Sequence, residues 1–149
     1  MSTGYDRILV PVDFSVNANR ALREAKRLLA EGGEIILLHV TEKLEPALPW
    51  SATNRKLITK LQREARSDAR AGLEKAAKAL GRLRVRRRVE SGVAEDRILE
   101  AARRERVGVI VIGAQGHTLS DRLLLGSTSE RVARKSSVPV LIVPPPRKR

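Results

Sequence analysis

The sequence contains no cysteine, which excludes disulfide bonds and thiolate metal sites. Aromatic residues make up only 2% of the chain, too few for the stacking platforms that bind single-stranded nucleic acids. No apolar run approaches the roughly 20 residues of a membrane-spanning helix, and the N-terminus lacks the basic and apolar regions of a signal peptide. We therefore expect a soluble, cytoplasmic protein without a membrane span.

The common catalytic and nucleotide-binding motifs are also missing. The chain has no G-x-x-x-x-G-K-[ST] loop, and no G-x-G-x-x-G follows its first apolar run. It has neither an H-E-x-x-H metal motif nor a recognisable Ser, His and Asp order. These absences predict no catalytic residue and no metal ion held by side chains. They argue against a fast hydrolase, so any hydrolytic activity is expected to be slow.

Positive charge is the most prominent feature of the composition. The net charge is +13, and the segment Arg55–Arg88 carries thirteen Lys and Arg against three acidic residues. Such a segment suits nucleic acid or an acidic partner, although a solvated basic helix face explains it equally well. Because aromatic residues are so few, we expect any nucleic-acid binding to be weak, salt-sensitive and non-specific.

Apolar residues alternate between strand-like runs and helical periodicity along the whole chain. The predicted strands are Arg7–Val12, Glu34–Val40, an Arg-rich edge strand over Leu83–Val89, Val107–Ile112 and Val138–Val143. The predicted helices cover residues 18–29, closed by Gly32 and Gly33, then 57–80, a segment that starts at Ser91–Glu95, and Ser127–Ser136. This alternation predicts one Rossmann-like α/β domain over residues 1–149, with a Pro-rich basic tail at 144–149. We expect a five-stranded parallel sheet of order 3-2-1-4-5 with helices on both faces.

The stretch GAQGHTLSDRLLLGSTSE, Gly113–Glu130, follows the fourth predicted strand. Ligands of open parallel sheets bind where the strand order reverses, which here lies between Pro11-Val12-Asp13 and Gly113-Ala114-Gln115-Gly116. Glycines at 113, 116 and 126 permit close backbone approach and positive φ, and the first turn at Ser127–Ser129 offers N–H groups to an anion. The alternative is structural: Ser127 and Glu130 form a capping box, and the glycines mark plain turns.

These residues resemble the universal stress protein family in its ATP-binding branch. The resemblance extends from Ile8–Ser15 to Val138–Val143, and it includes the spacing G-x2-G-x9-G-[ST] at Gly113, Gly116 and Gly126-Ser127. It implies binding of ATP, with AMP or ADP as alternatives, and Mg or Mn held on the phosphates. One departure is Ala114-Gln115, where many relatives have Ser and a basic or His residue, so phosphate affinity is expected to be weaker.

The resemblance also assigns residues to the nucleotide. The implied binding residues are Pro11, Val12, Asp13, Val40, Gly113, Ala114, Gln115, Gly116, His117, Gly126, Ser127, Thr128 and Ser129. It further implies a homodimer through Val138–Val143, whose apolar edge would otherwise remain unpaired. The resulting hypothesis is a nucleotide-dependent switch or stress-response regulator with an unknown protein partner. The alternative is a basic-surface module that docks nucleic acid or a partner without binding a nucleotide.

Overall fold

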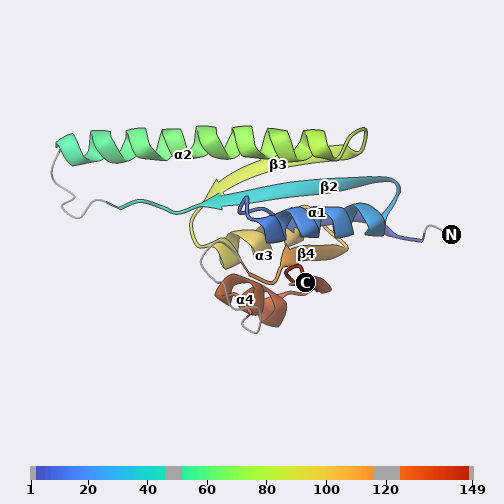
Figure 1. The fold of residues 1–149 in the computed structure, drawn as a ribbon. Coiled ribbons are helices and arrows are strands. Elements are labelled where there is room, and N and C mark those ends of the chain that lie inside the picture. Colours follow the sequence, from blue (N-terminus) through green and yellow to red (C-terminus); the bar gives the residue numbers. More distant parts are fainter. Residues whose placement is uncertain (1–2, 46–51, 116–124, 148–149) are drawn as a thin grey trace.

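The computed structural model describes residues 3–45, 52–115 and 125–147. Within them the chain alternates strands and helices from its first strand to its last (Figure 1). The strands are β1 (Tyr5–Pro11), β2 (Leu29–Thr41), β3 (Arg84–Ser91), β4 (Val109–Gly113) and β5 (Val140–Val143). The helices are α1 (Val16–Leu28), α2 (Ala52–Ala79), α3 (Ala94–Arg104) and α4 (Ser127–Lys135).

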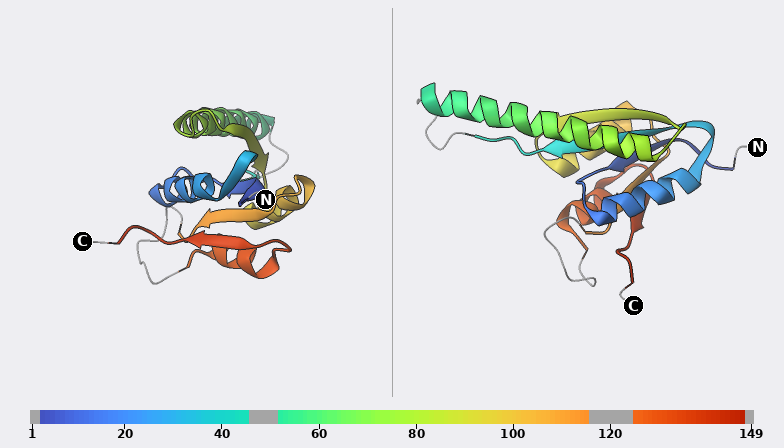
Figure 2. Two further views of the ribbon diagram at one scale, coloured as in Figure 1. Left: turned by 90° about the vertical axis from the view of Figure 1, so that its right-hand side faces the viewer. Right: turned by 45° about the horizontal axis from the view of Figure 1, so that its top comes forward.

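All strand pairs are parallel, and the sheet order β3-β2-β1-β4-β5 confirms the predicted topology. Alternate residues of each strand serve opposite faces, because successive side chains of a strand point to opposite sides of the sheet. Ile8 and Val10 pack with α1 and α2, whereas Leu9 packs with α3 and α4. Figure 2 shows these helices on the two sides of the twisted sheet. The strand order therefore reverses between β1 and β4.

Several boundaries differ from the sequence-based expectation. The first helix ends at Leu28 because Leu29 takes an extended conformation and pairs with Tyr5 in the sheet. The third helix begins at Ala94, inside the predicted start at Ser91–Glu95, and it has no side-chain cap. The last strand begins at Val140, since Pro139 has no N–H to donate and only its carbonyl joins the ladder, to Ile110.

The capping box at Ser127 and Glu130, which was the structural alternative to a ligand role, does not form. Gly126 is the N-cap of α4, and no side chain caps this helix end. The Ser129 hydroxyl instead donates to the Gly113 carbonyl oxygen at 2.7 Å, which ties the start of α4 to the end of β4. The N–H groups of the first turn of α4 therefore have no serine or threonine oxygen from their own turn as partner.

The Arg-rich strand β3 lies at an edge of the sheet, as predicted, and acidic residues neutralise part of its charge. Arg86 binds Glu34 with a bidentate pair of hydrogen bonds at 2.8 and 3.0 Å. Arg86 and Arg88 also pair with Glu105, a buried carboxylate beyond the end of α3. The hydrogen bond with Glu34 raises the pKa of the Arg86 guanidinium above its already high value. The charges of Arg86 and Arg88 are therefore paired with carboxylates within the fold.

Candidate functional site

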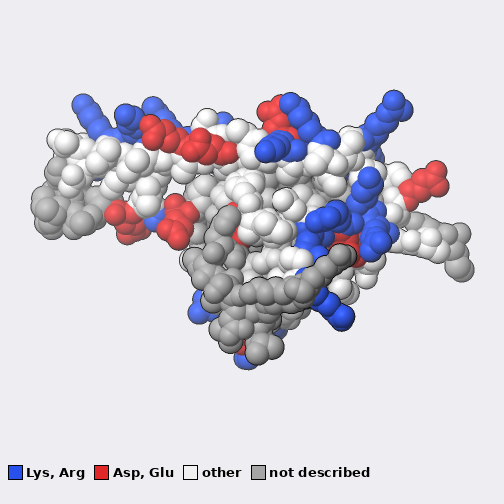
Figure 3. Space-filling model, viewed as in Figure 1, with Lys and Arg blue, Asp and Glu red and all other residues white. Residues whose placement is uncertain are grey.

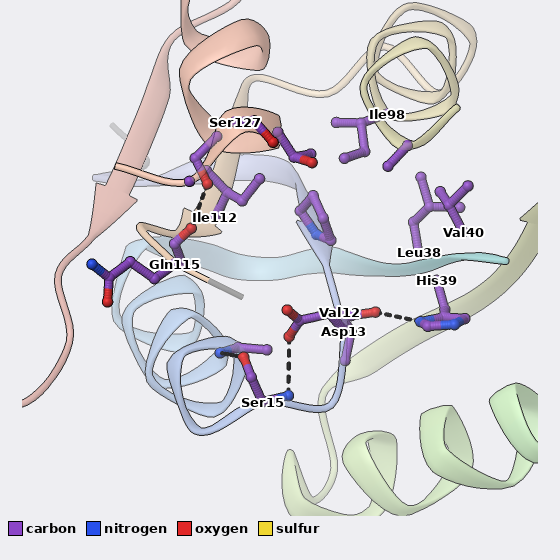
Figure 4. Close-up of a pocket in the computed structure, with 17 residues that line it drawn as sticks. Val12, Asp13, Ser15, Leu38, His39, Val40, Ile98, Ile112, Gln115 and Ser127 are labelled. Carbon is purple, nitrogen blue, oxygen red and sulfur yellow. Dashed lines mark hydrogen bonds between the residues drawn. The ribbon is translucent and has the colours of Figure 1, made fainter. Parts of the chain in front are cut away.

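A cavity of about 210 Å³ opens at the carboxyl ends of the central strands, where the strand order reverses. Figure 4 shows its lining: the β1–α1 turn with Asp13 and Ser15 on one side, and the first turn of α4 with Ser127 on the other, beside Ile98 of α3. Ten residues that the sequence analysis assigned to the ligand lie around it. They are Pro11, Val12, Asp13, Val40, Gly113, Gln115, Gly126, Ser127, Thr128 and Ser129.

The β1–α1 turn places Asp13 at the mouth of the cavity. The Asp13 carboxylate accepts a hydrogen bond from the Ser15 N–H at 3.0 Å, and the Ser15 hydroxyl accepts one from the Ala18 N–H at 3.2 Å. These two bonds fix the turn and cap α1. Asp13 is the only carboxylate among the described lining residues, so a positioned hydrogen-bond acceptor faces whatever enters here.

Phe14, the residue after Asp13, packs this turn against β2 and α2. Phe14 adopts a positive φ of 63°, which is unusual for a bulky side chain. Its ring stacks on His39 with the centroids 4.7 Å apart, and it lies so close to Gly72 of α2 that a Cβ there would be 2.5 Å from the Phe14 ring. His39 in turn donates from Nδ1 to the Val12 carbonyl oxygen at 2.6 Å. The pocket's β1 wall is thus held from both β2 and α2.

The opposite wall consists of backbone and hydroxyl groups. Gly126 begins α4, its N–H donates to the Ala114 carbonyl oxygen at 2.7 Å, and its missing side chain leaves room for that oxygen. Ser127 is exposed and Thr128 half-exposed at the cavity, so both present N–H and O–H groups to it. A helix N-terminus carries a partial positive charge that favours anions. No Lys or Arg occurs among the described lining residues.

Apolar side chains that the sequence analysis did not assign complete the pocket. Leu38 lies two residues before Val40 on the same face of β2, and Ile98 lies one turn after Ala94 on α3. Ile112 lines the cavity from β4. Successive side chains of a strand point to opposite faces, so Leu38 could have been assigned from its position two residues before Val40. The position of α3 at the site depends on how the chain crosses between strands. These side chains form a wall suited to a flat, weakly polar group such as a base.

Gly113 lines the cavity and also has a structural role. Its backbone does not have a positive φ, and a Cβ on it would lie 3.0 Å from Asn17 Cβ and 3.1 Å from the Asn17 backbone. The missing side chain thus permits close contact with α1. Asn17 also donates from its amide to the Gln115 carbonyl oxygen at 2.7 Å. Ala114 is buried but does not line the cavity, and Gly116 and His117 lie outside the described residues.

The cavity therefore offers one carboxylate, a row of helix N-terminal donors and an apolar wall, with no group of metal-ligating side chains among the described residues. No described helix is long and apolar enough to cross a membrane. A cavity at the switch point of an open parallel sheet is where α/β proteins of this Rossmann-like class bind their ligands. The sequence profile described as "Universal stress protein family" matches residues 4–144, and the chain belongs to this family.

Comparison with individual proteins agrees with that assignment. Universal stress protein MJ0577 of Methanocaldococcus jannaschii is 32% identical over 157 residues, which cover 96% of this chain and 97% of the relative. A solved structure of MJ0577 superposes with a TM-score of 0.85 at 30% identity and covers 97% and 99% of the two chains. A universal stress protein solved in complex with cAMP superposes with a TM-score of 0.64 at 25% identity and covers 94% and 97%.

Proposed function

We propose that this chain binds an adenine nucleotide in the switch-point cavity, with ATP as the ligand and AMP or ADP as alternatives. One observation carries the proposal: Asp13 and Val40 at one end, and the first turn of α4 at Gly126–Ser129, line a single cavity. The apolar wall accommodates the base, Asp13 accepts hydrogen bonds from the sugar or base, and the helix N-terminus receives phosphate. The related structure described in complex with cAMP supports an adenine ligand.

Mg or Mn is expected to enter with the phosphates rather than in a protein-held site. The described lining supplies no Lys or Arg to neutralise a triphosphate, so the bound cation must carry much of that compensation. Calorimetric titration with ATP and Mg should give micromolar affinity, about −8 kcal/mol. Removing the metal with EDTA should weaken ATP roughly tenfold or more and leave adenosine unchanged. Absence of binding by both ligands would contradict the proposal.

Occupancy of the site is proposed to act as a switch, with at most slow ATP hydrolysis. The loop Ala114–Leu125 joins two of the cavity walls, since Gln115 and Gly126 both line it, and bound phosphate would bias this loop and thereby binding of an unidentified protein partner. Slow hydrolysis is compatible with helix donors and a metal that stabilise charge in the transition state. Hydrogen exchange over residues 114–125 should slow when ATP and Mg are added, and identical exchange would argue against a switch.

We also propose that the protein forms a cytoplasmic homodimer through Val138–Val143. Strand β5 is a sheet edge, and Leu141 is 37% exposed there. An apolar edge strand offers unpaired backbone groups to a second copy. Sedimentation equilibrium should give twice the 16.5 kDa mass of one chain, and a monomer at micromolar concentration would contradict this interface.

A further inference from the structure

Helix α2 divides its exposed surface into two flanks of different chemistry. It carries eight Lys and Arg against three acidic residues. One flank holds basic residues three or four positions apart, and this spacing places them on one side of the helix. We call this set the basic row: Lys56, Lys60, Arg63, Arg66 and Arg70. The other flank carries the exposed Leu57 and Leu61 together with Glu64 and Asp68.

The basic row borders the free edge of the sheet. Arg66 donates from Nη2 to the carbonyl oxygen of Val89 in β3 at 3.1 Å, and β3 is an outermost strand of the sheet. Val85 and Val89 pack toward the core that α1 and α2 cover. Arg87 lies between them in the strand, and alternate residues of a strand point to the same face, so this exposed arginine points to the α2 side as well. Arg87 therefore adds a further cation next to the row.

No ion pair in the described part of the chain neutralises these cations. Neither the basic row nor Arg87 forms one there, although Glu64 lies at the border of the row. Arg86 and Arg88 differ, because they pair with Glu105 on the opposite face of β3. Figure 3 shows basic side chains projecting from the upper edge of α2 and a band of acidic side chains on the face turned to the viewer. The row and Arg87 therefore form one surface of exposed positive charge.

We propose that the basic row and Arg87 bind the phosphate backbone of double-stranded nucleic acid without reading its sequence. From Lys56 to Arg70 the row extends for about 21 Å, at about 1.5 Å per residue. Each strand of a duplex presents a phosphate roughly every 3.4 Å along the axis, so the row can contact several phosphates at once. Guanidinium groups suit phosphate because they form bidentate hydrogen bonds with its oxygens. None of these residues is among the described lining of the switch-point cavity, so the inference does not depend on nucleotide binding.

Other partners fit this surface less well. Single-stranded nucleic acids stack their bases on aromatic side chains, and the sequences of α2 and β3 contain none. A membrane-binding helix combines its basic face with an apolar face that enters the bilayer, whereas here the carboxylates of Glu64 and Asp68 lie beside the exposed leucines and would repel anionic lipid. Protein partners need apolar or aromatic anchors at the centre of the interface, which the row lacks. Phosphate contacts alone, in contrast, supply the affinity of sequence-independent binding.

The test uses fluorescent DNA and RNA duplexes of about 20 base pairs and mixed sequence, titrated with the intact protein and followed by anisotropy. Both should bind with a dissociation constant on the order of 10 μM at physiological salt, and log K should fall against log salt with a slope of about −3 to −5. Arg63→Gln with Arg70→Gln should weaken binding roughly tenfold or more and make this slope shallower by about 2, because each variant residue removes one phosphate contact. Binding of only one duplex type would show readout of the sugar or of helix shape, and would overturn recognition through the backbone alone.

The matched control is Arg23→Gln with Lys26→Gln, which removes the same charge from exposed positions of α1. It should change duplex binding by less than about threefold, since exposed charges away from the contact are screened by salt. Gln has a helix propensity close to those of Arg and Lys, so both double variants should keep the parent's melting temperature. Equal weakening by the two variants would assign binding to overall net charge and overturn the proposal, as would tighter binding to single-stranded DNA, to phosphatidylserine vesicles or to polyglutamate. ATP titration of both variants should match the parent, which separates this test from that of the nucleotide site.

Discussion

Thr128→Asp should abolish ATP binding while the protein remains folded and still binds adenosine. Thr128 lies in the first turn of α4 and lines the cavity. A carboxylate there would face the phosphates at a position where the structure supplies only neutral donors. At about 4 Å two like charges repel by roughly 4 kcal/mol under protein-like screening, and about 2.8 kcal/mol already corresponds to a hundredfold loss.

The substitution is chosen because it should not damage the fold. An acidic side chain in the first turn of a helix interacts favourably with the helix dipole, by about 0.3 to 1 kcal/mol. Glu130 already occupies this turn. The free energy of unfolding without ligand should therefore be equal to or slightly above that of the parent, measured by urea denaturation.

Thr128→Val is the matched control, since it keeps the shape of the side chain and adds no charge. It should retain ATP binding with a loss of less than about tenfold, because one hydrogen bond is worth about 1 kcal/mol. Calorimetry of ATP with Mg, AMP and adenosine on all three proteins makes the comparison. Unchanged ATP affinity in Thr128→Asp would place the phosphates elsewhere, and loss of adenosine as well would show a collapsed pocket.

Much of the fold follows from patterns in the sequence. Strand runs such as Glu34–Val40 are apolar on both faces, as β2 requires between helices on either side of the sheet. The Arg-rich strand was correctly expected at an edge, where it lies as β3. The ends of helices and strands were less predictable, because they depend on which residues pair across the sheet. Leu29 has a helical spacing, yet its partner Tyr5 places it in the sheet.

The candidate site was predictable where it follows a strand end and much less so where tertiary structure creates it. Asp13 and Gly126–Ser129 come together because the carboxyl ends of parallel strands share one edge of the sheet. Ile98 of α3 and the Phe14–His39 stack have no local signal, since they depend on how the crossovers bring separate segments together. The ion pairs could not be predicted from the sequence either. Nothing in the Arg-rich segment indicates that Arg86 and Arg88 form salt bridges with Glu105.

Gly113 shows why a glycine in a binding motif can serve the scaffold. The spacing of Gly113, Gly116 and Gly126 predicts close approach to phosphate, and in the structure Gly113 also closely approaches Asn17 of α1. The same missing Cβ would satisfy either role, so sequence spacing could not distinguish them. The two roles nevertheless have different consequences for stability and for ligand binding.

Gly113→Val should destabilise the protein by about 2 to 3 kcal/mol with or without ligand. A Cβ at this position would lie 3.0 Å from Asn17 Cβ and 3.1 Å from the Asn17 backbone, which α1 cannot easily move. Added side-chain volume at a close contact typically costs about 1 to 3 kcal/mol. For a chain of this length the melting temperature should fall by roughly 5 to 10 °C. Gly113→Ala should show a smaller loss in the same direction.

The contrast with Thr128→Asp decides which role Gly113 has. Saturating ATP and Mg should raise the melting temperature of any variant whose site is intact, because the proposed ligand would bind only the folded state. Gly113→Val should melt early yet keep most of this ligand-induced rise, whereas Thr128→Asp should melt normally and lose it. If Gly113→Val instead has the parent's melting temperature without ligand and no rise with it, Gly113 is a ligand contact. Thermal scans of both variants with and without ATP and Mg therefore separate the packing of β4 on α1 from the binding of phosphate.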